Sequence, residues 1–205
     1  MSGPVGEATF DPDLPRCPWA GADAARPDPL MVRYHDDEWG TPCHDDVELF
    51  ERLALESFQA GLSWSTILRK RASFRTAFRG FDPAVVAAFG DDDRARLMAD
   101  AGIVRNRAKI DATIGNAGAW LVLADEFGSA DAYLAAKVPG PPLRLGPDAR
   151  MGSIPATTAV SDRLSSDLRR RGFRFVGSTI VYAFMQSIGL VDDHLPTCFR
   201  YVVTR

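Results

Sequence analysis

The residue types best suited to chemistry gather in one short segment, YHDDEWG at positions 34–40. An aromatic ring, an imidazole and three neighbouring carboxylates stand side by side in it, followed by a tryptophan and a glycine. No helical or strand period of apolar residues explains this mixture. The combination of a potential metal ligand, aromatic rings and acid therefore predicts a functional role rather than a packing role for this segment.

A possible metal-binding set includes His35 of this segment. His194 and Cys198 are four residues apart, so one helical turn would direct both side chains the same way. With Cys17 near the N-terminus, these residues supply two thiolates and two imidazoles, which saturate a tetrahedral structural zinc site. Such a site would join the two ends of the chain.

The spacing of these residues is not that of a zinc finger, and two other interpretations stay open. Cys43 and His44 form a competing pair of ligands. Alternatively, the cysteines and histidines are scattered buried residues without a metal. Pro196 also makes the turn between His194 and Cys198 less regular, unless it stands at the start of a helix.

A second candidate site is the segment LESFQAGLSW at positions 55–64. Glu56 stands among apolar residues, close to an expected helix end at Gly61 and before Trp64. Burying a carboxylate in apolar surroundings is costly unless the charge is paired. A cationic ligand would pair it, and an aromatic face would add a cation–π attraction. The alternative is a glutamate on the edge of an amphipathic helix.

A third candidate is LMADAGIVRNRAKIDATIGNA, in which two helical stretches are joined by a tight turn at Gly102 and Ile103. Such a hairpin exposes backbone N–H groups at a helix N-terminus, where they can hold a phosphate. The nearby Arg105, Arg107 and Lys109 would add attraction to a polyanion that does not depend on its sequence. The alternative is an ordinary helical corner with a solvated basic end.

The charge distribution supports a local nucleic-acid face despite a net charge of -3. Acidic residues gather between positions 36 and 56, whereas basic residues form clusters at 69–79, 105–109 and 169–174. A single charge run is usually a solvated face. Three basic clusters in an acidic chain indicate a surface that can bind nucleic acid.

The elements that must position these residues are helical. Apolar residues recur at helical spacing over 47–60, and residues 91–100 and 106–128 also read as helices. Asp82 and Pro83 are typical of a helix N-cap and first position. A further helix is expected to start at Ser161 and Asp162 and to stop at Gly172, followed by a buried helix in VGSTIVYAFMQSIG. Residues 138–155 are rich in proline and glycine and predict a loop, and no strand alternation is evident.

The whole chain of 205 residues predicts one all-α unit of eight to ten short helices, spanning residues 14–205. A helical bundle over about 46–125 would be completed by a lobe formed from the N- and C-terminal segments, with residues 1–13 as a mobile tail. The absence of an apolar run of about 18 residues argues against a membrane span. Without an evident signal peptide, the protein is expected in the cytoplasm, where its three cysteines stay reduced.

In combination, these segments resemble the DNA-3-methyladenine glycosylase I (TAG) family of the helix-hairpin-helix DNA glycosylase superfamily. The similarity runs from about Cys17 to Cys198. It includes, in order, RCPW, YHDDEWG, LFERLALE, QAGLSW, ILRKR, FDPAVVA, AGIVRNRAKI, GNA and RRRGFRFVGSTIVYAFMQSIGLVDDH. Ordered motifs over most of the chain exclude a chance similarity.

The resemblance implies the helix-hairpin-helix DNA glycosylase fold and a monofunctional enzyme of base-excision repair. Its substrate would be double-stranded DNA containing alkylated bases, and it would hydrolyse the N-glycosidic bond of 3-methyladenine. The products would be the free base and an abasic site. Two alternatives remain: a glycosylase that also accepts 3-methylguanine, and a non-catalytic protein that binds alkylation damage. A monomer is expected.

The resemblance also assigns roles to individual residues. Glu56, Tyr34 and Trp64 would bind the base, and Leu62 would fill the space left by the extruded base unless it is a core leucine. The DNA backbone would be held around the hairpin by Gly102, Ile103, Arg105, Arg107 and Lys109. One structural Zn²⁺ would be held by Cys17, His35, His194 and Cys198.

Four positions qualify this assignment. Met31 stands where many family members have a second pocket tyrosine, so one aromatic contact would be missing or replaced by sulfur–aromatic packing. Trp39 is expected to pack beneath the pocket rather than close it. Asp192 and Asp193 occupy the region where the wider superfamily carries a catalytic aspartate, but we expect them to support the turn beside His194.

Overall fold

The computed structural model describes residues 10–21 and 27–202. Most of the expected N-terminal tail, residues 1–9, lies outside the described residues. The remainder of that segment contacts Arg16, whose guanidinium lies 5.4 Å from the centre of the Phe10 ring. The same guanidinium donates a hydrogen bond of 2.7 Å to the carbonyl oxygen of Asp11.

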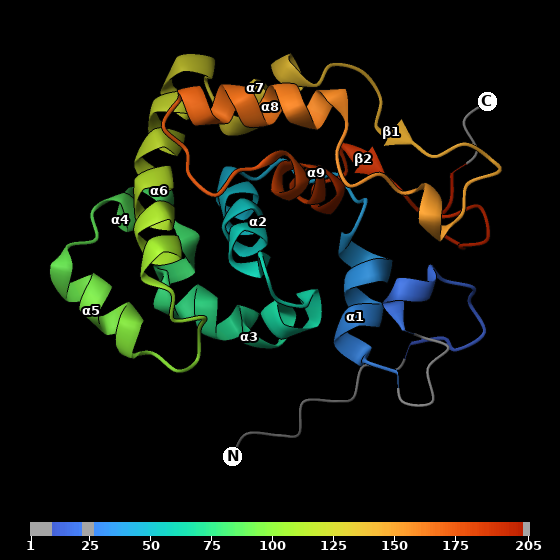
Figure 1. Cartoon of the computed structure of the whole chain (residues 1–205), viewed down its shortest axis with the longest axis horizontal. Helices are drawn as coiled ribbons and strands as arrows, with labels where there is room; N and C mark the ends of the chain where they lie inside the picture. The colour runs from blue at the N-terminus through green and yellow to red at the C-terminus, as the bar shows by residue number, and fades with distance from the viewer. Residues whose placement is uncertain (1–9, 22–26, 203–205) are drawn as a thin grey trace.

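The chain folds almost entirely into helices, as the sequence predicts (Figure 1). The α-helices are α1 (Pro29–Arg33), α2 (Asp46–Gln59), α3 (Trp64–Ala77), α4 (Pro83–Ala87), α5 (Asp91–Ala99), α6 (Arg107–Phe127), α7 (Ala130–Lys137), α8 (Ala159–Arg170) and α9 (Ser178–Ser187). Short 3-10 turns η1 (Pro18–Ala20), η3 (Arg79–Phe81) and η4 (Met151–Ser153) and a π-helical turn η2 (Tyr34–Glu38) complete the helical elements. Among the described residues, no helix has both the length and the apolar character needed to cross a membrane.

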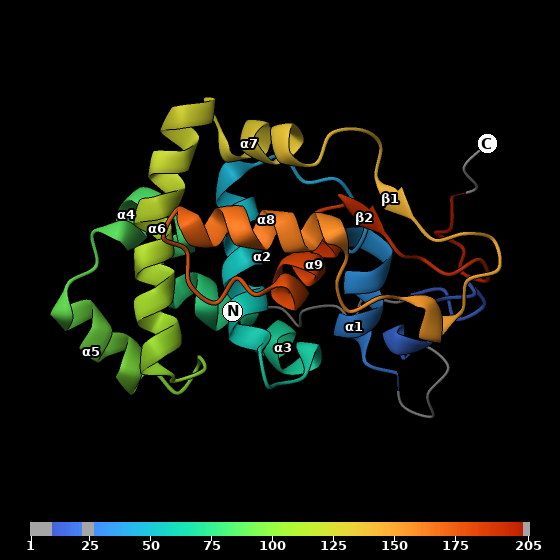
Figure 2. The ribbon, with the colours of Figure 1, turned by 45° about the horizontal axis from the view of Figure 1, so that its top comes forward.

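The helices form two parts that meet along α2 and α9 (Figures 1 and 2). One part contains α2 to α9, and its core is built on the buried faces of α2 and α6 together with buried residues of α7, α8 and α9. In the other part, the N-terminal segment lies beside the end of the chain, and a second, smaller core contains Cys17, Tyr34, Trp39 and Cys198. Trp64 packs against both cores, so the boundary between the two parts passes through it.

Local capping explains where the main helices begin. The carboxylate of Asp45 accepts hydrogen bonds from the backbone N–H groups of Val47 and Glu48 and so starts α2. The expected cap at Asp82 is confirmed, with Pro83 at the first helical position of α4. In contrast, α8 begins two residues before Ser161, because Thr158 is the N-cap and exchanges hydrogen bonds with Ser161.

The Pro- and Gly-rich segment 138–155 is not purely a loop, contrary to the sequence-based expectation. It contains a two-residue strand β1 (Leu143–Arg144), which pairs in parallel with β2 (Val191–Asp192). It also contains η4, which returns the chain to the side of α1 and α9. Two-residue strands leave no periodic pattern in a sequence, which is why the pairing was missed.

Candidate active site and cysteine–histidine centre

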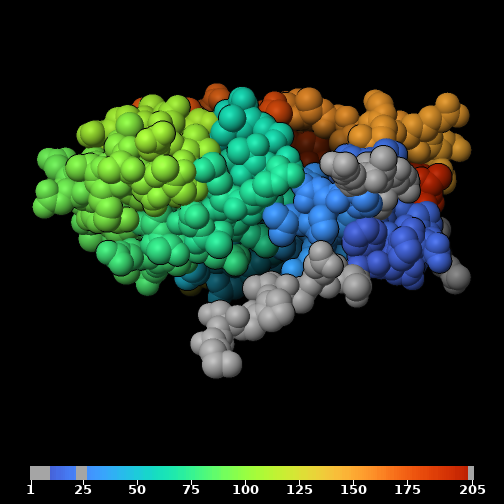
Figure 3. Space-filling model, turned by 90° about the horizontal axis from the view of Figure 1, so that it is seen from below, coloured from blue at the N-terminus to red at the C-terminus, as the bar shows by residue number. Residues whose placement is uncertain are grey.

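An apolar cavity that contains the predicted base-binding residues lies where the two parts meet. Its volume is about 320 Å³, within the range of small-molecule sites. In Figure 3 the surface is hollowed where the teal, blue and orange segments meet, with α9 deep inside. The cavity is lined by Trp19, Met31, Tyr34, Trp39, Glu56, Gln59, Trp64, Met151, Ile154, Ala183 and Gln186. The structure therefore brings the three predicted base-binding residues, Tyr34, Glu56 and Trp64, into one cavity.

Glu56 is the charged group of this cavity. It lies on the last turns of α2 and is 4% exposed. Burial raises the pKa of its carboxyl to about 8, and the positive charge of Arg52 opposes this shift only in part. Arg52 itself is bonded to Glu48 and to the carbonyl oxygen of Ser187. No group among the described residues donates a hydrogen bond to the Glu56 carboxylate, so the cavity contains an acid without an internal partner.

Aromatic rings form the walls around this acid. The rings of Tyr34 and Trp64 lie 5.0 Å apart at an angle of 52°, and those of Trp19 and Trp39 lie 4.8 Å apart. Burial, followed by the negative charge of Glu56, raises the pKa of Tyr34 well above its usual value, so its hydroxyl stays protonated. The cavity thus offers flat apolar surfaces with one acid, an arrangement that suits a planar cation.

The segment YHDDE forms the π-helical turn η2, and its side chains point to different partners. Tyr34 faces the cavity. His35 reaches the cysteines, and Asp36 accepts hydrogen bonds from both His35 and Arg16. Glu38 forms a two-pronged ion pair with Arg71 of α3. A wider turn than an α-helix therefore places one short segment in both the pocket and the cysteine–histidine centre.

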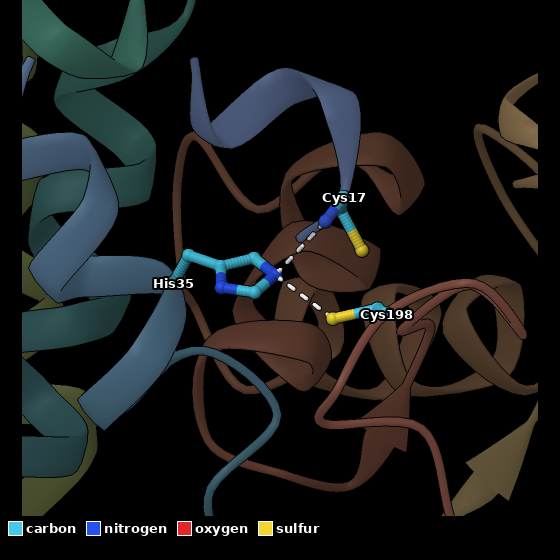
Figure 4. A group of neighbouring side chains, drawn as sticks. All are labelled: Cys17, His35 and Cys198. Carbon is cyan, nitrogen blue, oxygen red and sulfur yellow. Dashed lines mark hydrogen bonds between the residues drawn. The ribbon is translucent and has the colours of Figure 1, made fainter. Parts of the chain in front are cut away.

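The cysteine–histidine centre contains three of the four predicted metal ligands in close proximity (Figure 4). One potential ligand atom from each of Cys17, His35 and Cys198 lies within 4.8 Å of the other two. The Cys198 sulfur is 3.4 Å from Nε2 of His35. All three residues are buried, although His35 and Cys198 are separated by 163 positions in the chain.

His194 is the fourth predicted ligand and the second imidazole of the set. Its ring centre lies 4.9 Å from that of His35, and its Nε2 atom is buried without a hydrogen-bond partner among the described residues. Its Nδ1 atom is 2.7 Å from a carboxylate oxygen of Asp192, as Nδ1 of His35 is from Asp36. Carboxylates at both Nδ1 atoms leave the Nε2 atoms free to bind a metal, an arrangement frequent in zinc proteins.

A glycine allows this close packing. Gly40 follows η2 with a φ of +71°, and a Cβ atom there would lie 2.9 Å from a ring carbon of His194. Trp39, the preceding residue, lines the cavity and also lies edge-on to His194, with ring centres 4.7 Å apart. Trp39 therefore both packs and lines the pocket, and the pocket shares a wall with the cysteine–histidine centre.

The competing pair, Cys43 and His44, does not form a comparable centre. The His44 side chain is 73% exposed and pairs with Asp131. Cys43 is buried, and it belongs to no group of three or more converging ligand atoms among the described residues. The geometry favours the set that contains Cys17.

The predicted hairpin is formed by α5, the turn at 100–106 and α6. The side chain of Asn106 caps α6 by accepting a hydrogen bond from the N–H of Lys109. The Asp100 carboxylate accepts a hydrogen bond of 2.7 Å from the N–H of Gly102. A Cβ atom at Gly102 would lie 3.0 Å from the Ser73 side chain, so a glycine lets the hairpin approach α3. Ile103 is buried and anchors the turn in the core.

The cations predicted to bind DNA differ in their environments. Arg105 is exposed and has no ion-pair partner among the described residues. Arg107 is paired with Asp111 at 3.0 Å. Lys109 is buried, and its ammonium donates hydrogen bonds to two backbone carbonyls near the end of α2. The structure therefore gives Lys109 a role inside the protein, and within the described part of the chain Arg105 is the cation of this set without an ion pair.

Many of the basic residues in the other two clusters, at 69–79 and 169–174, form ion pairs within the protein. In the first, Arg69 pairs with Asp28, Arg71 with Glu38 and Arg75 with Glu51. In the last, Arg170 pairs with Asp167, and Arg171 pairs with both Asp167 and Glu126. These ion pairs reduce the number of free cations below what the sequence indicates.

The structure places Leu62 at the surface and not in the core. Leu62, in the turn between α2 and α3, is 41% exposed, which rules out the alternative of a core leucine.

Several pocket residues had not been identified from the sequence: Trp19, Gln59, Met151, Ile154, Ala183 and Gln186. Trp19 follows Cys17 in the RCPW motif and could have been found there. Met151 and Ile154 come from the Pro- and Gly-rich segment, which carried no such signal.

Asp192 and Asp193 are held away from the cavity. Asp192 bonds to His194 and to Arg144, as expected for support of the turn beside the histidine. Asp193 accepts hydrogen bonds from the Tyr182 hydroxyl and from the side-chain amide of Gln186. Neither aspartate lines the pocket, although Asp193 fixes Gln186, which does.

Comparison with known proteins shows the family of this chain. A family model described as methyladenine glycosylase matches residues 24–201. DNA-3-methyladenine glycosylase 1 of Escherichia coli strain K12 is 45% identical over 92% of this chain and 97% of the relative. The chain belongs to the DNA-3-methyladenine glycosylase I (TAG) family. A TAG-family relative from Haemophilus influenzae is 44% identical over 89% of this chain and 96% of its own length.

Solved TAG structures share the fold. One crystal structure of a TAG superposes with a TM-score of 0.84 at 44% identity, covering 91% of this chain and all of that chain. The Staphylococcus aureus TAG, whose structure concerns 3-methyladenine recognition, gives a TM-score of 0.82 at 36% identity over 87% of this chain and 94% of its own. The helical TAG fold implied by the sequence resemblance is thus confirmed.

Proposed function

We propose that this chain is a DNA-3-methyladenine glycosylase that hydrolyses the N-glycosidic bond of 3-methyladenine in alkylated double-stranded DNA. The products are the free base and an abasic site. The observation that carries the proposal is the carboxyl of Glu56, buried without an internal partner in an aromatic cavity. The names of the family's members, which describe the same activity, support it.

Selectivity follows from the charge of the lesion. Methylation at N3 makes the base in DNA cationic, whereas unmodified adenine is neutral. The buried Glu56 carboxyl favours its protonated form in the empty protein near neutral pH, since its pKa is about 8. A cationic base restores the missing opposite charge and favours the carboxylate, which then accepts charge-assisted hydrogen bonds. A neutral base provides no such compensation.

The leaving group does much of the chemistry. As the glycosidic bond breaks, its electron pair stays with the cationic base, which departs as neutral 3-methyladenine, and the positive charge passes to the sugar. Water then adds to the anomeric carbon and loses a proton. The bond is already weakened by the charge on the base, so the enzyme need not supply a strong acid. Among the described residues that line the cavity, the only titratable side chain besides Glu56 is Tyr34, which stays protonated.

The base can reach the cavity only after extrusion from the duplex, which costs less for a damaged base. The exposed Leu62, six residues after Glu56, is suited to fill the space that the base leaves. Backbone N–H groups at the start of α6, together with Arg105, are suited to hold a DNA phosphate. Figure 3 presents the green hairpin region, the teal α2–α3 region and the blue N-terminal segment on one face.

A structural Zn²⁺ is the second part of the proposal. The residues present fit this ion: two buried thiols and one imidazole converge, and the orphaned Nε2 atom of His194 lies beside them. When bound, the ion would join the N-terminal segment to the C-terminal segment through Cys17, His35, His194 and Cys198. The ion would stabilise the fold and fix the position of Trp39, which lies between the centre and the cavity. It would take no part in the chemical step.

The test is chromatography of the bases released from methylated duplex DNA by the purified protein. The parent protein should release 3-methyladenine, and Glu56→Gln should release it more slowly. At a pH low enough to protonate free 3-methyladenine, so that it is cationic as the lesion is in DNA, it should bind Glu56→Gln more weakly by about 1–3 kcal/mol, the scale of a hydrogen bond to a charged group. The matched control is Asp37→Asn, which removes an exposed carboxylate from the same cavity-forming region and should leave both measurements unchanged.

Two results would contradict the proposal in different ways. If the parent protein binds methylated DNA but releases no base, the chain is a damage-binding protein without catalysis. If Glu56→Gln binds and releases 3-methyladenine as the parent does, then Glu56 is not the selective group and the base binds elsewhere.

A further inference from the structure

The end of α2 is held by a lysine from the hairpin. Lys109, in the first turn of α6, donates hydrogen bonds of 2.9 Å to the carbonyl oxygen of Phe58 and 2.7 Å to that of Ala60. Carbonyls at the end of a helix lack partners within the helix and lie at its negative end, so an ammonium group there is favourable. In the chain, these carbonyls lie between Glu56, the acid of the pocket, and Leu62, which is proposed to fill the space left by the extruded base.

A second lysine makes the opposite connection. Lys70, on α3, donates hydrogen bonds of 3.0 Å to the carbonyl oxygen of Ala101 and 3.2 Å to that of Gly102, in the hairpin turn. The α3 helix begins just after the turn that carries Leu62. The hairpin thus holds the end of α2, and α3 holds the hairpin.

Both ammonium groups are committed to carbonyl oxygens. Lys109 is 7% exposed, and its burial lowers the pKa of the ammonium. It forms no ion pair with a described carboxylate, so burying this charge is compensated by the two carbonyls alone. An ammonium used in this way is poorly placed to bind a phosphate as well.

We propose that Lys109 and Lys70 form a lysine clamp that fixes the distance between the DNA-backbone anchor and the base pocket. They are positioning residues for base extrusion, not phosphate ligands, and this inference rests on the proposed function. An extruded nucleotide stays attached to its phosphates. Its base therefore enters the cavity only if the phosphates are held at a set distance from Glu56, and small misplacements in such an arrangement reduce rates strongly.

The test compares Lys109→Met and Lys70→Met with Arg105→Gln. Methionine keeps an unbranched stem and removes the donors. Both lysine variants should release 3-methyladenine from methylated duplex about tenfold to a hundredfold more slowly in single turnovers. Their affinity for undamaged duplex should keep the parent's salt dependence, and their affinity for free 3-methyladenine should stay close to the parent's. Arg105→Gln should instead lower the slope of log affinity against log salt by about one.

The inference is overturned if the lysine variants lower the salt slope as Arg105→Gln does, since they would then be phosphate ligands. It is also overturned if folded variants release the base at the parent's rate. Should Lys109→Met fail to fold by circular dichroism, the half-buried Lys70→Met carries the same test. Failure of the proposed function itself would be distinct, because the parent protein would then release no base.

Discussion

At the scale of single residues, the site depends on one buried acid. Glu56 is placed in an apolar aromatic cavity without a neutralising partner, which costs stability whenever it is ionised. Natural proteins frequently accept such a cost at functional sites. The cost should therefore appear as a pH-dependent difference in stability between the parent protein and a variant without the Glu56 carboxyl.

We predict that Glu56→Gln stabilises the empty protein at high pH. The folded pKa of about 8 lies above the unfolded value of 4.5, so the folded state binds the proton more tightly. The contribution of Glu56 to stability is fully present below pH 4.5 and is lost as the pH rises through about 8. The melting temperature of Glu56→Gln minus that of the parent should thus be small near pH 5 and grow up to about pH 8.

The measurement is differential scanning calorimetry of both proteins across that pH range. Other groups titrate equally in both proteins, so the difference isolates Glu56. A difference that does not change with pH would mean that the Glu56 carboxyl keeps an ordinary pKa, and hence that the cavity is open to water in solution.

At the scale of elements, the hairpin is a docked unit whose position depends on close approach to α3. A Cβ atom at Gly102 would lie 2.9 Å from an Asp100 carboxylate oxygen and 3.0 Å from the Ser73 side chain. An alanine at this position must therefore displace the turn, and with it Arg105 and the start of α6. The effect should appear in DNA-backbone binding and not in recognition of the lesion.

We predict that Gly102→Ala weakens binding to methylated and unmethylated duplexes by the same factor. A charge reversal, Arg105→Glu, should do the same and also reduce the salt dependence of binding, because one phosphate contact is lost. Fluorescence anisotropy with both duplexes at several salt concentrations measures these effects. Gly118→Ala is a control on the same hairpin helix, since a Cβ atom there has no neighbour within 4 Å. A loss confined to the methylated duplex would place the hairpin at the base instead.

At the scale of the whole molecule, the cysteine–histidine centre connects the two ends of the chain. Cys17 and Cys198 converge on His35, and Trp39 separates this centre from the cavity. Loss of the proposed metal should therefore loosen the lobe formed by the N- and C-terminal segments and change the wall of the pocket. A bound metal would couple stability and pocket shape through this centre.

We predict about one zinc ion per chain, lost on substitution of a ligand. Cys17→Ala and Cys198→Ala should each lose most of the metal and melt at a lower temperature than the parent. The control is Cys43→Ala, a buried cysteine outside the centre, which should keep its zinc. Elemental analysis after dialysis measures the content. Full retention of zinc by Cys17→Ala would reject this set of ligands.

Several features of this protein could be predicted from sequence because they depend on nearby residues. Helices α2, α4 and α6 follow from apolar spacing and from caps within three or four positions, such as Asp82 before Pro83. The hairpin turn at Gly102 has the same local origin. The ordered motifs, taken together, indicated the family and so the pocket acid.

Other features were decided only by the tertiary structure, because they join positions far apart in the chain. His35 and Cys198 meet across 163 positions, and spacing alone could not choose this set over Cys43 and His44. Met151 reaches the cavity because β1 pairs with β2, whose two residues are too few to form a recognisable pattern. Lys109 looked like a free cation beside a hairpin. Only the folded chain brings the carbonyls of Phe58 and Ala60 to its ammonium, since side-chain partners are set by packing and not by sequence neighbours.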